Sequence, residues 1–193
     1  DGIVIGLFHS DIYDARSNYM PMSKEDILNL NAHYIALGHI HKRSEVLDTG
    51  DCVYCYPGCL CPRDFGETDE KGGYYLEFDS NKPSKPYIKF IPFGSIKYIV
   101  HELNTELYNN ITDAVNSLPA NMLDPGVNLR IKLIGASRLD VGQLTDLITS
   151  AVSDRVMQIQ IIDATEEAID YLSLENDKSV AGEFYRLLKP RLD

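Results

Sequence analysis

The sequence has no apolar run long enough to cross a bilayer, and no basic segment followed by an apolar one opens it. We therefore expect a cytoplasmic protein. Basic residues are scarce, since 18 Lys and Arg stand against 29 Asp and Glu and give a formal net charge of −11. This balance excludes a simple basic nucleic-acid-binding module. It leaves phosphate chemistry open, because bound divalent cations supply positive charge where a phosphate must sit.

Cysteine is absent outside one short stretch, which holds Cys52, Cys55, Cys59 and Cys61. A disulfide framework does not fit a cytoplasmic chain. Two interpretations stay open, a zinc or iron–sulfur cluster and a set of reduced, half-buried cysteines. The C-x-C spacing of the second pair favours reduced cysteines. So does the strand-like setting of the first pair, which places Cys52 and Cys55 on opposite faces.

The sequence contains enough hydrophobic residues to form a buried core. Its 193 residues are 44% hydrophobic and 24% charged, ordinary values for a globular protein of one large or two small domains.

Histidines follow two of its short apolar segments. The segment 34–37 reads as a buried strand that stops at Gly38 and is followed by His39 and His41. The segment 3–8 is a second such strand and ends on His9. Sites in α/β sheets form outside the carboxyl ends of the strands, and imidazole is a common metal ligand. This pattern predicts a metal site, and the alternative is a set of loop histidines, one solvated and one hydrogen-bonded.

Local signals predict the remaining elements up to residue 93. Ser23 and Asp26 form a capping-box pattern that begins a helix over 24–31. Turn-forming residues then separate four strand-like segments, which we expect to form an antiparallel run, with a turn at 79–86 before the last: 44–47, 52–56, 73–78 and 87–93.

The pattern changes near Gly94. A strand over 96–101, a helical stripe from Leu103 to Leu118, a strand over 127–133, a helix capped by Asp140 and a strand over 157–161 predict a β-α-β-α-β module. A polar connection over 164–177 and a helix over 178–189 follow. We therefore predict three parts, with bounds 1–93, 94–163 and 164–193.

Four motifs together carry a family resemblance: GLFHS, HYIALGHIHKR, YPGCLCPRDFGE and KGGYYLEF. They resemble the calcineurin-like metallophosphoesterases, and within them the SbcD-type DNA repair exonucleases. The resemblance implies an α/β (α+β) fold, namely the C-terminal half of a metallophosphoesterase β-sandwich followed by a small cap domain. It also implies phosphodiester hydrolysis on DNA, and an SbcC-like ATPase subunit as partner.

By the same resemblance, His9 and His39 bind one metal of a two-metal manganese site and His41 binds the other. The family's early motifs, D-x-H, G-D-x-x-D and G-N-H-D/E, are not found in the sequence. We therefore expect a fragment that holds no catalytic residue, is inactive alone and binds at most one cation weakly. An apolar sheet face left uncovered would make it a homodimer or keep it bound to the N-terminal half.

Two departures from the family pattern concern single positions. His33 stands where an acidic residue is usual, which puts support of the histidine pair in doubt, and 59–61 (Cys-Leu-Cys) replaces hydroxyl- or amide-bearing residues. Two other functions stay open. One is a metallophosphoesterase that acts on nucleotides or phosphoproteins, and the other is a non-catalytic cap module that binds DNA or a partner.

Overall fold

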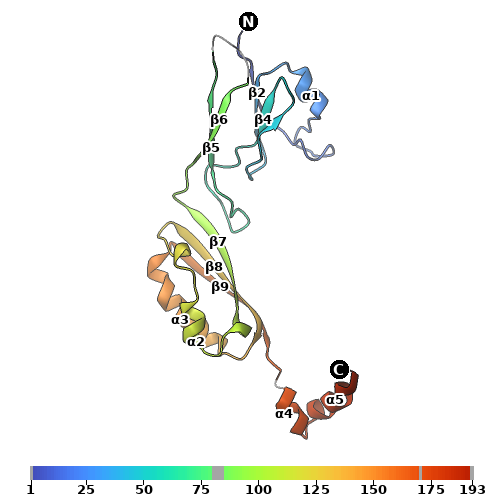
Figure 1. The fold of residues 1–193 in the computed structure, drawn as a ribbon, viewed down its shortest axis with the longest axis vertical. Coiled ribbons are helices and arrows are strands. Elements are labelled where there is room, and N and C mark those ends of the chain that lie inside the picture. The colour runs from blue at the N-terminus through green and yellow to red at the C-terminus, as the bar shows by residue number, and fades with distance from the viewer. Residues whose placement is uncertain (1, 80–84, 170, 192–193) are drawn as a thin grey trace. The chain divides into compact units, whose positions relative to one another are not determined.

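The computed structural model describes residues 2–79, 85–169 and 171–191. It has the predicted mixed α/β character, with several sheets and helices (Figure 1). Backbone contacts divide it into two compact units, 1–100 with 122–129 and 155–158, and 101–121 with 130–154 and 159–193. The predicted division into three parts stays a prediction. None of the helices within the described residues is long and apolar enough to span a membrane.

The first unit is built on a four-stranded sheet with the order β1-β2-β4-β3. Strand β1 (Ile5–His9) runs parallel to β2 (Tyr34–Gly38), with His9 opposite Gly38 at the carboxyl ends. Strand β4 (Val53–Cys55) pairs in parallel with the other edge of β2, and β3 (Leu47–Asp48) pairs antiparallel with β4. The two strands predicted to lead into the histidines are therefore confirmed, and the structure adds that they pair directly with each other.

The central strands β2 and β4 of this sheet are covered on both faces, as short apolar parallel strands require. On one face lies helix α1 (Lys24–Asn29), whose Ile27 is buried with Ile35 and Tyr56. The capping box of Ser23 is confirmed. On the other face lies the antiparallel hairpin of β5 (Gly72–Glu77) and β6 (Tyr87–Pro92), where Tyr74 and Leu76 pack against the cluster of Tyr34, Val53 and Cys55.

The predicted antiparallel run after His41 is partly wrong. The segment 44–47 is not a strand apart from its last residue, and β4 joins the parallel sheet beside β2 instead of continuing a meander. Burial explains the difference, because all three residues of β4 are buried and only the centre of a covered sheet provides that environment. Most of the predicted turn at 79–86 lies outside the described residues.

A second sheet has the order β7-β8-β9. Its strands are β7 (Lys97–Asn104), β8 (Val127–Ser137) and β9 (Gln158–Glu167), and its helices are α2 (Ile111–Asn116) and α3 (Val141–Val152). The alternating apolar residues of β8 are buried, as are Leu144, Ile148 and Val152 of α3. The order β-α-β-α-β and the cap at Asp140 are confirmed.

Two predictions in this part are wrong. The helical stripe from Leu103 to Leu118 yields only the six residues of α2, because Leu103 still belongs to β7 and Asn110 caps a later helix start. The connection over 164–177 is not irregular in its described part, since β9 continues to Glu167 and α4 (Tyr171–Asn176) follows. The last helix, α5 (Val180–Leu188), falls within its predicted range. Short 3-10 turns complete the chain: Thr105–Leu107, Ala120–Met122, Ser153–Arg155 and Lys189–Arg191.

Candidate metal centre

The parallel pairing of β1 and β2 brings two of the predicted ligands together. His9 ends β1 opposite Gly38, and His39 follows Gly38 directly. The centroids of the two imidazole rings lie 5.3 Å apart, with the ring planes at 69°. The sheet therefore brings two imidazoles, a common type of metal ligand, together at the carboxyl ends of its strands, where sites form in α/β sheets.

His39 has an unusual backbone conformation. Its φ is 98°, in the region that favours glycine, so a non-glycine residue there carries strain of about 1–3 kcal/mol. The ring stacks on Tyr19, with centroids 4.4 Å apart, and its Nε2 lies 4.0 Å from the Asp11 Oδ2. The loop residues Asp11 and Tyr19 therefore hold the His39 ring in place on its strained backbone.

His41 is held by a carboxylate from a different loop. Its Nδ1 lies 2.7 Å from the Oε1 of Glu67. The Oε2 of Glu67 accepts hydrogen bonds from the backbone N–H of Arg63 at 3.1 Å and from the Cys59 thiol at 3.2 Å. Partial burial acts to raise the pKa of the Glu67 carboxyl. The hydrogen bonds from His41, Cys59 and the Arg63 N–H, together with the charge of Lys71, outweigh it and lower that pKa to about 2.

The loop 57–71 also fixes the backbone of His41. The carbonyl oxygen of His41 accepts from the Lys71 ammonium at 2.9 Å and from the backbone N–H of Cys59 at 3.2 Å. Gly58 has a φ of 81°, and a Cβ there would lie 2.8 Å from this same carbonyl oxygen. Only glycine allows the loop to approach His41 so closely.

Asp11 provides a carboxylate beside His39. Its Oδ1 accepts hydrogen bonds from the backbone N–H groups of Tyr13 and Asp14, at 2.9 and 3.2 Å. The hydrogen bond from Tyr13 is the main cause of the lowered pKa of the Asp11 carboxyl. Each histidine of the G-H-x-H motif thus has an ionised carboxylate near one ring nitrogen, a pattern typical of metal-bound histidines.

The loop that carries Asp11 is anchored by one buried hydroxyl of Tyr56, the residue that follows β4. The Tyr56 hydroxyl donates to the Ser10 carbonyl at 2.6 Å and accepts from the Ile12 N–H at 3.0 Å, and the residue is fully buried.

Replacing Tyr56 by phenylalanine is expected to lower the free energy of unfolding by about 1–3 kcal/mol, because both backbone groups then lose a buried partner. Urea unfolding followed by circular dichroism measures this loss. Tyr87→Phe is the matched control, since Tyr87 is 61% exposed and its change should stay below about 0.5 kcal/mol. Equal unfolding midpoints for the two variants would contradict the anchoring role of Tyr56.

The structure brings together only part of the predicted ligand set. The structure brings the rings of His9 and His39 together, whereas the His41 ring contacts Glu67. Their roles as ligands stay predictions. The donor set fits a metal, because imidazoles backed by carboxylates suit first-row divalent cations. His41, Cys59 and Glu67 also form a group whose potential ligand atoms all lie within 4.8 Å of one another.

The four cysteines do not form the cluster that was one interpretation of their spacing. Cys52 is buried on the α1 face of the sheet and Cys55 on the hairpin face, as predicted from their alternation. Cys59 contacts Glu67, and Cys61 is exposed. All four are free thiols.

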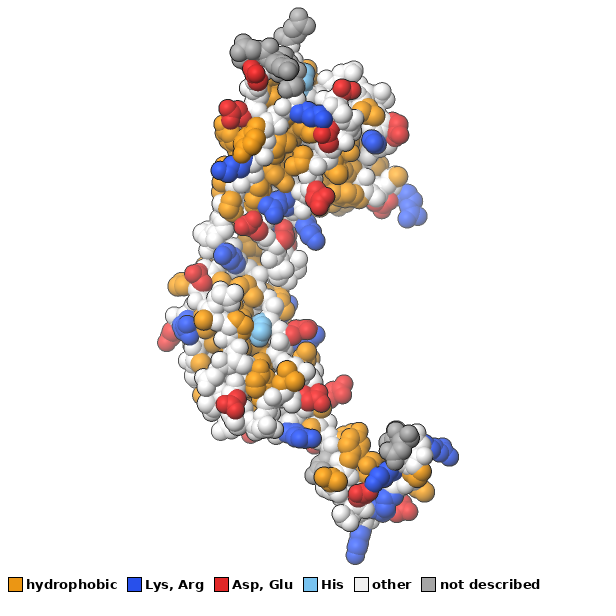
Figure 2. Space-filling view, viewed as in Figure 1, with side chains coloured by type: hydrophobic (Ala, Val, Ile, Leu, Met, Phe, Trp, Pro, Cys, Tyr) orange, Lys and Arg blue, Asp and Glu red, His pale blue; other side chains and the backbone are white. Residues whose placement is uncertain are grey.

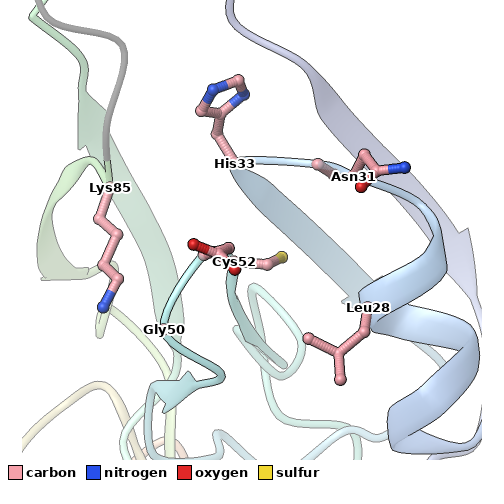
Figure 3. A pocket seen from close by; sticks show the side chains of 8 residues that line it. Leu28, Asn31, His33, Gly50, Cys52 and Lys85 are labelled. Carbon is pink, nitrogen blue, oxygen red and sulfur yellow. The ribbon is translucent and has the colours of Figure 1, made fainter.

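His33 lies at the opposite end of β2 from the candidate centre. Its Nδ1 accepts a hydrogen bond from the backbone N–H of Val4 at 3.0 Å. It lines a cavity of about 590 Å³ with Leu28, Asn31, Gly50, Cys52 and Lys85 (Figure 3). The predicted effect of His33 on the histidine pair is therefore wrong, because a whole strand separates it from His39.

Sequence reasoning missed four residues that hold the histidines: Asp11, Tyr19, Glu67 and Lys71. A signal for two of them existed, since Glu67 and Lys71 lie within the motifs DFGE and KGG that carry the resemblance. The resemblance, however, assigned no function to Glu67 or Lys71. Asp11 and Tyr19 lie in an irregular loop and carry no spacing signal.

The comparison with known proteins agrees with a phosphoesterase site. No family model matches the chain. Over 79 residues, however, the chain is similar to a metallophosphoesterase, a class that uses metal ions in phosphoester hydrolysis. That relative is the uncharacterized metallophosphoesterase YhaO of Bacillus subtilis (strain 168), with 37% identity. The match covers 40% of this chain and 19% of YhaO, so it spans about a fifth of that relative's length.

Proposed function

We propose that this chain belongs to the nuclease subunit of a metal-dependent DNA repair exonuclease of the SbcD kind, which hydrolyses phosphodiester bonds. The observation that carries the proposal is the contact between the His9 and His39 rings at the carboxyl ends of two paired strands. The similarity to a metallophosphoesterase supports the general reaction. The motifs YPGCLCPRDFGE and KGGYYLEF support the nuclease branch.

In this proposal the protein residues bind and orient. His9 and His39 supply imidazole nitrogens to one cation, and His41 supplies one to a second. Metals bound there, which we propose to be manganese, would polarise the phosphodiester and lower the pKa of a bound water. The bridging aspartate that such a pair needs is not among the 193 residues, so this chain by itself should have little or no nuclease activity.

We propose DNA and an SbcC-like ATPase subunit as partners. The helix pair α4–α5 suits a protein partner, because Val180, Phe184 and Leu187 recur at helical spacing and are 87%, 63% and 69% exposed. Figure 2 shows hydrophobic and basic side chains side by side on this segment. An exposed apolar stripe of this kind is what an amphipathic partner helix covers. Copurification of the ATPase subunit with the wild type but not with Phe184→Glu tests this surface.

A second association surface is expected on β1. Its side chains Ile5 and Leu7 are 54% and 81% exposed, although the corresponding faces of β2 and β4 are covered by the hairpin. We propose that a second copy of the chain or the N-terminal half of the catalytic domain covers them. Light scattering that gives only monomers of the isolated chain, with no aggregation, would contradict this.

The experiment that tests the function compares three substrates. The whole protein, loaded with Mn²⁺, is assayed on duplex DNA, on a nucleotide phosphodiester and on a phosphopeptide. The proposal expects degradation of DNA, loss of that activity in His39→Asn, and its retention in His101→Asn, a histidine of the second unit. Activity confined to the nucleotide or the phosphopeptide would favour another metallophosphoesterase, and DNA binding without hydrolysis would favour a non-catalytic module.

One observation counts against the binding-module alternative. Two basic residues on the sheet face of β8 already have partners on the neighbouring strands. Arg130 donates to Gln160 at 2.8 Å, and Lys132 forms an ion pair with Glu102 at 3.2 Å. Cross-strand pairs of this kind stabilise a sheet, and the carboxylate of Glu102 offsets the positive charge of Lys132.

A further inference from the structure

The carboxylate of Glu67 occupies a central position between His41 and its own loop. One oxygen lies 2.7 Å from the His41 Nδ1, and the other accepts from Arg63 N–H and the Cys59 thiol. The side chain of Glu67 is 15% exposed, whereas that of His41 is 43% exposed. The Glu67 carboxylate is therefore fixed by hydrogen bonds from its own loop, and the His41 imidazole is the more exposed member of the pair.

This arrangement determines which nitrogen of His41 can bind a cation. A carboxylate only accepts hydrogen bonds, so the nitrogen that faces it carries the proton. In a neutral ring the other nitrogen, Nε2, then has a free lone pair. A metal-bound histidine commonly donates its second N–H to a carboxylate, which fixes the tautomer and the ring orientation.

We propose that Glu67 is a positioning residue for His41, which holds Nδ1 protonated and presents Nε2 as the metal-binding atom. This inference rests on the proposed metal centre. Cys59 and the Arg63 N–H fix the Glu67 carboxylate, so the loop 59–67 acts on the centre through His41 and not by contact with the metal.

The rival arrangement is a metal bound by His41, Cys59 and Glu67 themselves, whose ligand atoms lie close enough. Two features favour positioning. The Lys71 ammonium, whose side chain is 3% exposed, lies 3.9 Å from the Glu67 Oε2 and would repel a cation placed there. The distances from Glu67 to His41 and Cys59 are those of hydrogen bonds, and a metal would have to replace both bonds and deprotonate the thiol.

The test begins with the tautomer of His41, observed through the side-chain nitrogen resonances of the ring. The wild type should have the Nδ1–H form, and Glu67→Ala should shift the population toward Nε2–H. Glu67→Gln should keep the Nδ1–H form, because the amide oxygen still accepts the hydrogen bond. Glu70→Ala is the matched control in the same loop, since Glu70 is exposed and pairs with Arg43. This readout needs no metal and no substrate. An unchanged tautomer in Glu67→Ala overturns the proposal.

The second part measures Mn²⁺ binding to the same four forms of the whole protein, because His41 is proposed to bind the second of two cations. Glu67→Ala should bind about 10- to 100-fold more weakly than the wild type, with Glu67→Gln between them and Glu70→Ala unchanged. Unchanged binding in Glu67→Ala overturns the positioning role while the metal centre stands. No metal-induced change at any histidine of the wild type would instead contradict the proposed function, and with it the metal-binding part of this inference.

Cobalt distinguishes the rival site. With Co²⁺ the proposal expects no thiolate-to-metal charge-transfer absorption, and it expects Cys59→Ser to bind like the wild type because a hydroxyl still donates to Glu67. A charge-transfer band that disappears in Cys59→Ser would make Cys59 a ligand. That result would contradict the positioning role of Glu67 and would indicate a metal site formed by the loop itself.

Discussion

Replacing His39 by asparagine is expected to weaken binding of Mn²⁺ at least about 10-fold, since loss of a ligand should cost no less than loss of a residue that supports one. Asparagine is chosen because it tolerates positive φ values better than alanine, so the backbone at 98° can be kept. The binding of the 193-residue chain is already expected to be weak, and a further tenfold loss should abolish it at accessible metal concentrations.

The loss of the free Mn²⁺ signal in electron paramagnetic resonance measures this binding directly. His33→Asn serves as the control, because His33 precedes β2 and contacts Val4 instead of the centre. The account expects wild-type binding for His33→Asn. Equal binding by the wild type and His39→Asn would mean that His39 is a loop histidine without a ligand role.

Replacing Ile35 by alanine is expected to lower the free energy of unfolding by about 2–5 kcal/mol. Ile35 is the second residue of β2, is 0% exposed, and belongs to the cluster that α1 covers. Removing its side chain leaves a cavity between the sheet and Ile27, because a strand paired on both edges cannot move to fill it.

Urea unfolding compared with Leu60→Ala provides the test, since Leu60 belongs to the same unit but is 62% exposed. The control should change stability by less than about 0.5 kcal/mol. A loss below 1 kcal/mol for Ile35→Ala would indicate that the sheet and α1 are not packed as described. Loss of metal binding in Ile35→Ala is expected only where the chain unfolds, because Ile35 does not contact the histidines directly.

Local patterns predicted the parts of the fold that depend on neighbours in sequence. The strands that end at His9 and Gly38 were predicted because a short apolar run that ends at a histidine or a glycine is compatible with few structures other than a buried strand. The helix after Ser23 was predicted because both halves of its capping box are visible in the sequence.

Predictions failed where pairing or helix length depends on distant residues. The stripe from Leu103 to Leu118 mixes a strand residue with a later helix, and periodicity alone cannot separate them. The parallel pairing of β4 with β2 likewise depends on burial from both faces, which a local pattern of three residues does not reveal.

The candidate site was predicted in the same uneven way. The ligands His9, His39 and His41 are visible as residues after strands, but the side chains that orient them are not. Glu67 comes from a loop 26 residues after His41, and its role depends on how that loop folds back onto the His41 carbonyl. Such a contact has no signature in spacing or composition.

The central claim is that His9, His39 and His41 converge on divalent metal. Paramagnetic broadening of the histidine ring resonances during a titration with Mn²⁺ tests it most directly, with His33, which lies at the opposite end of β2, as an internal reference. The account predicts that the rings of His9, His39 and His41 broaden at substoichiometric Mn²⁺ while the ring of His33 stays sharp. Uniform broadening of all these rings, or none at the first three, would contradict it.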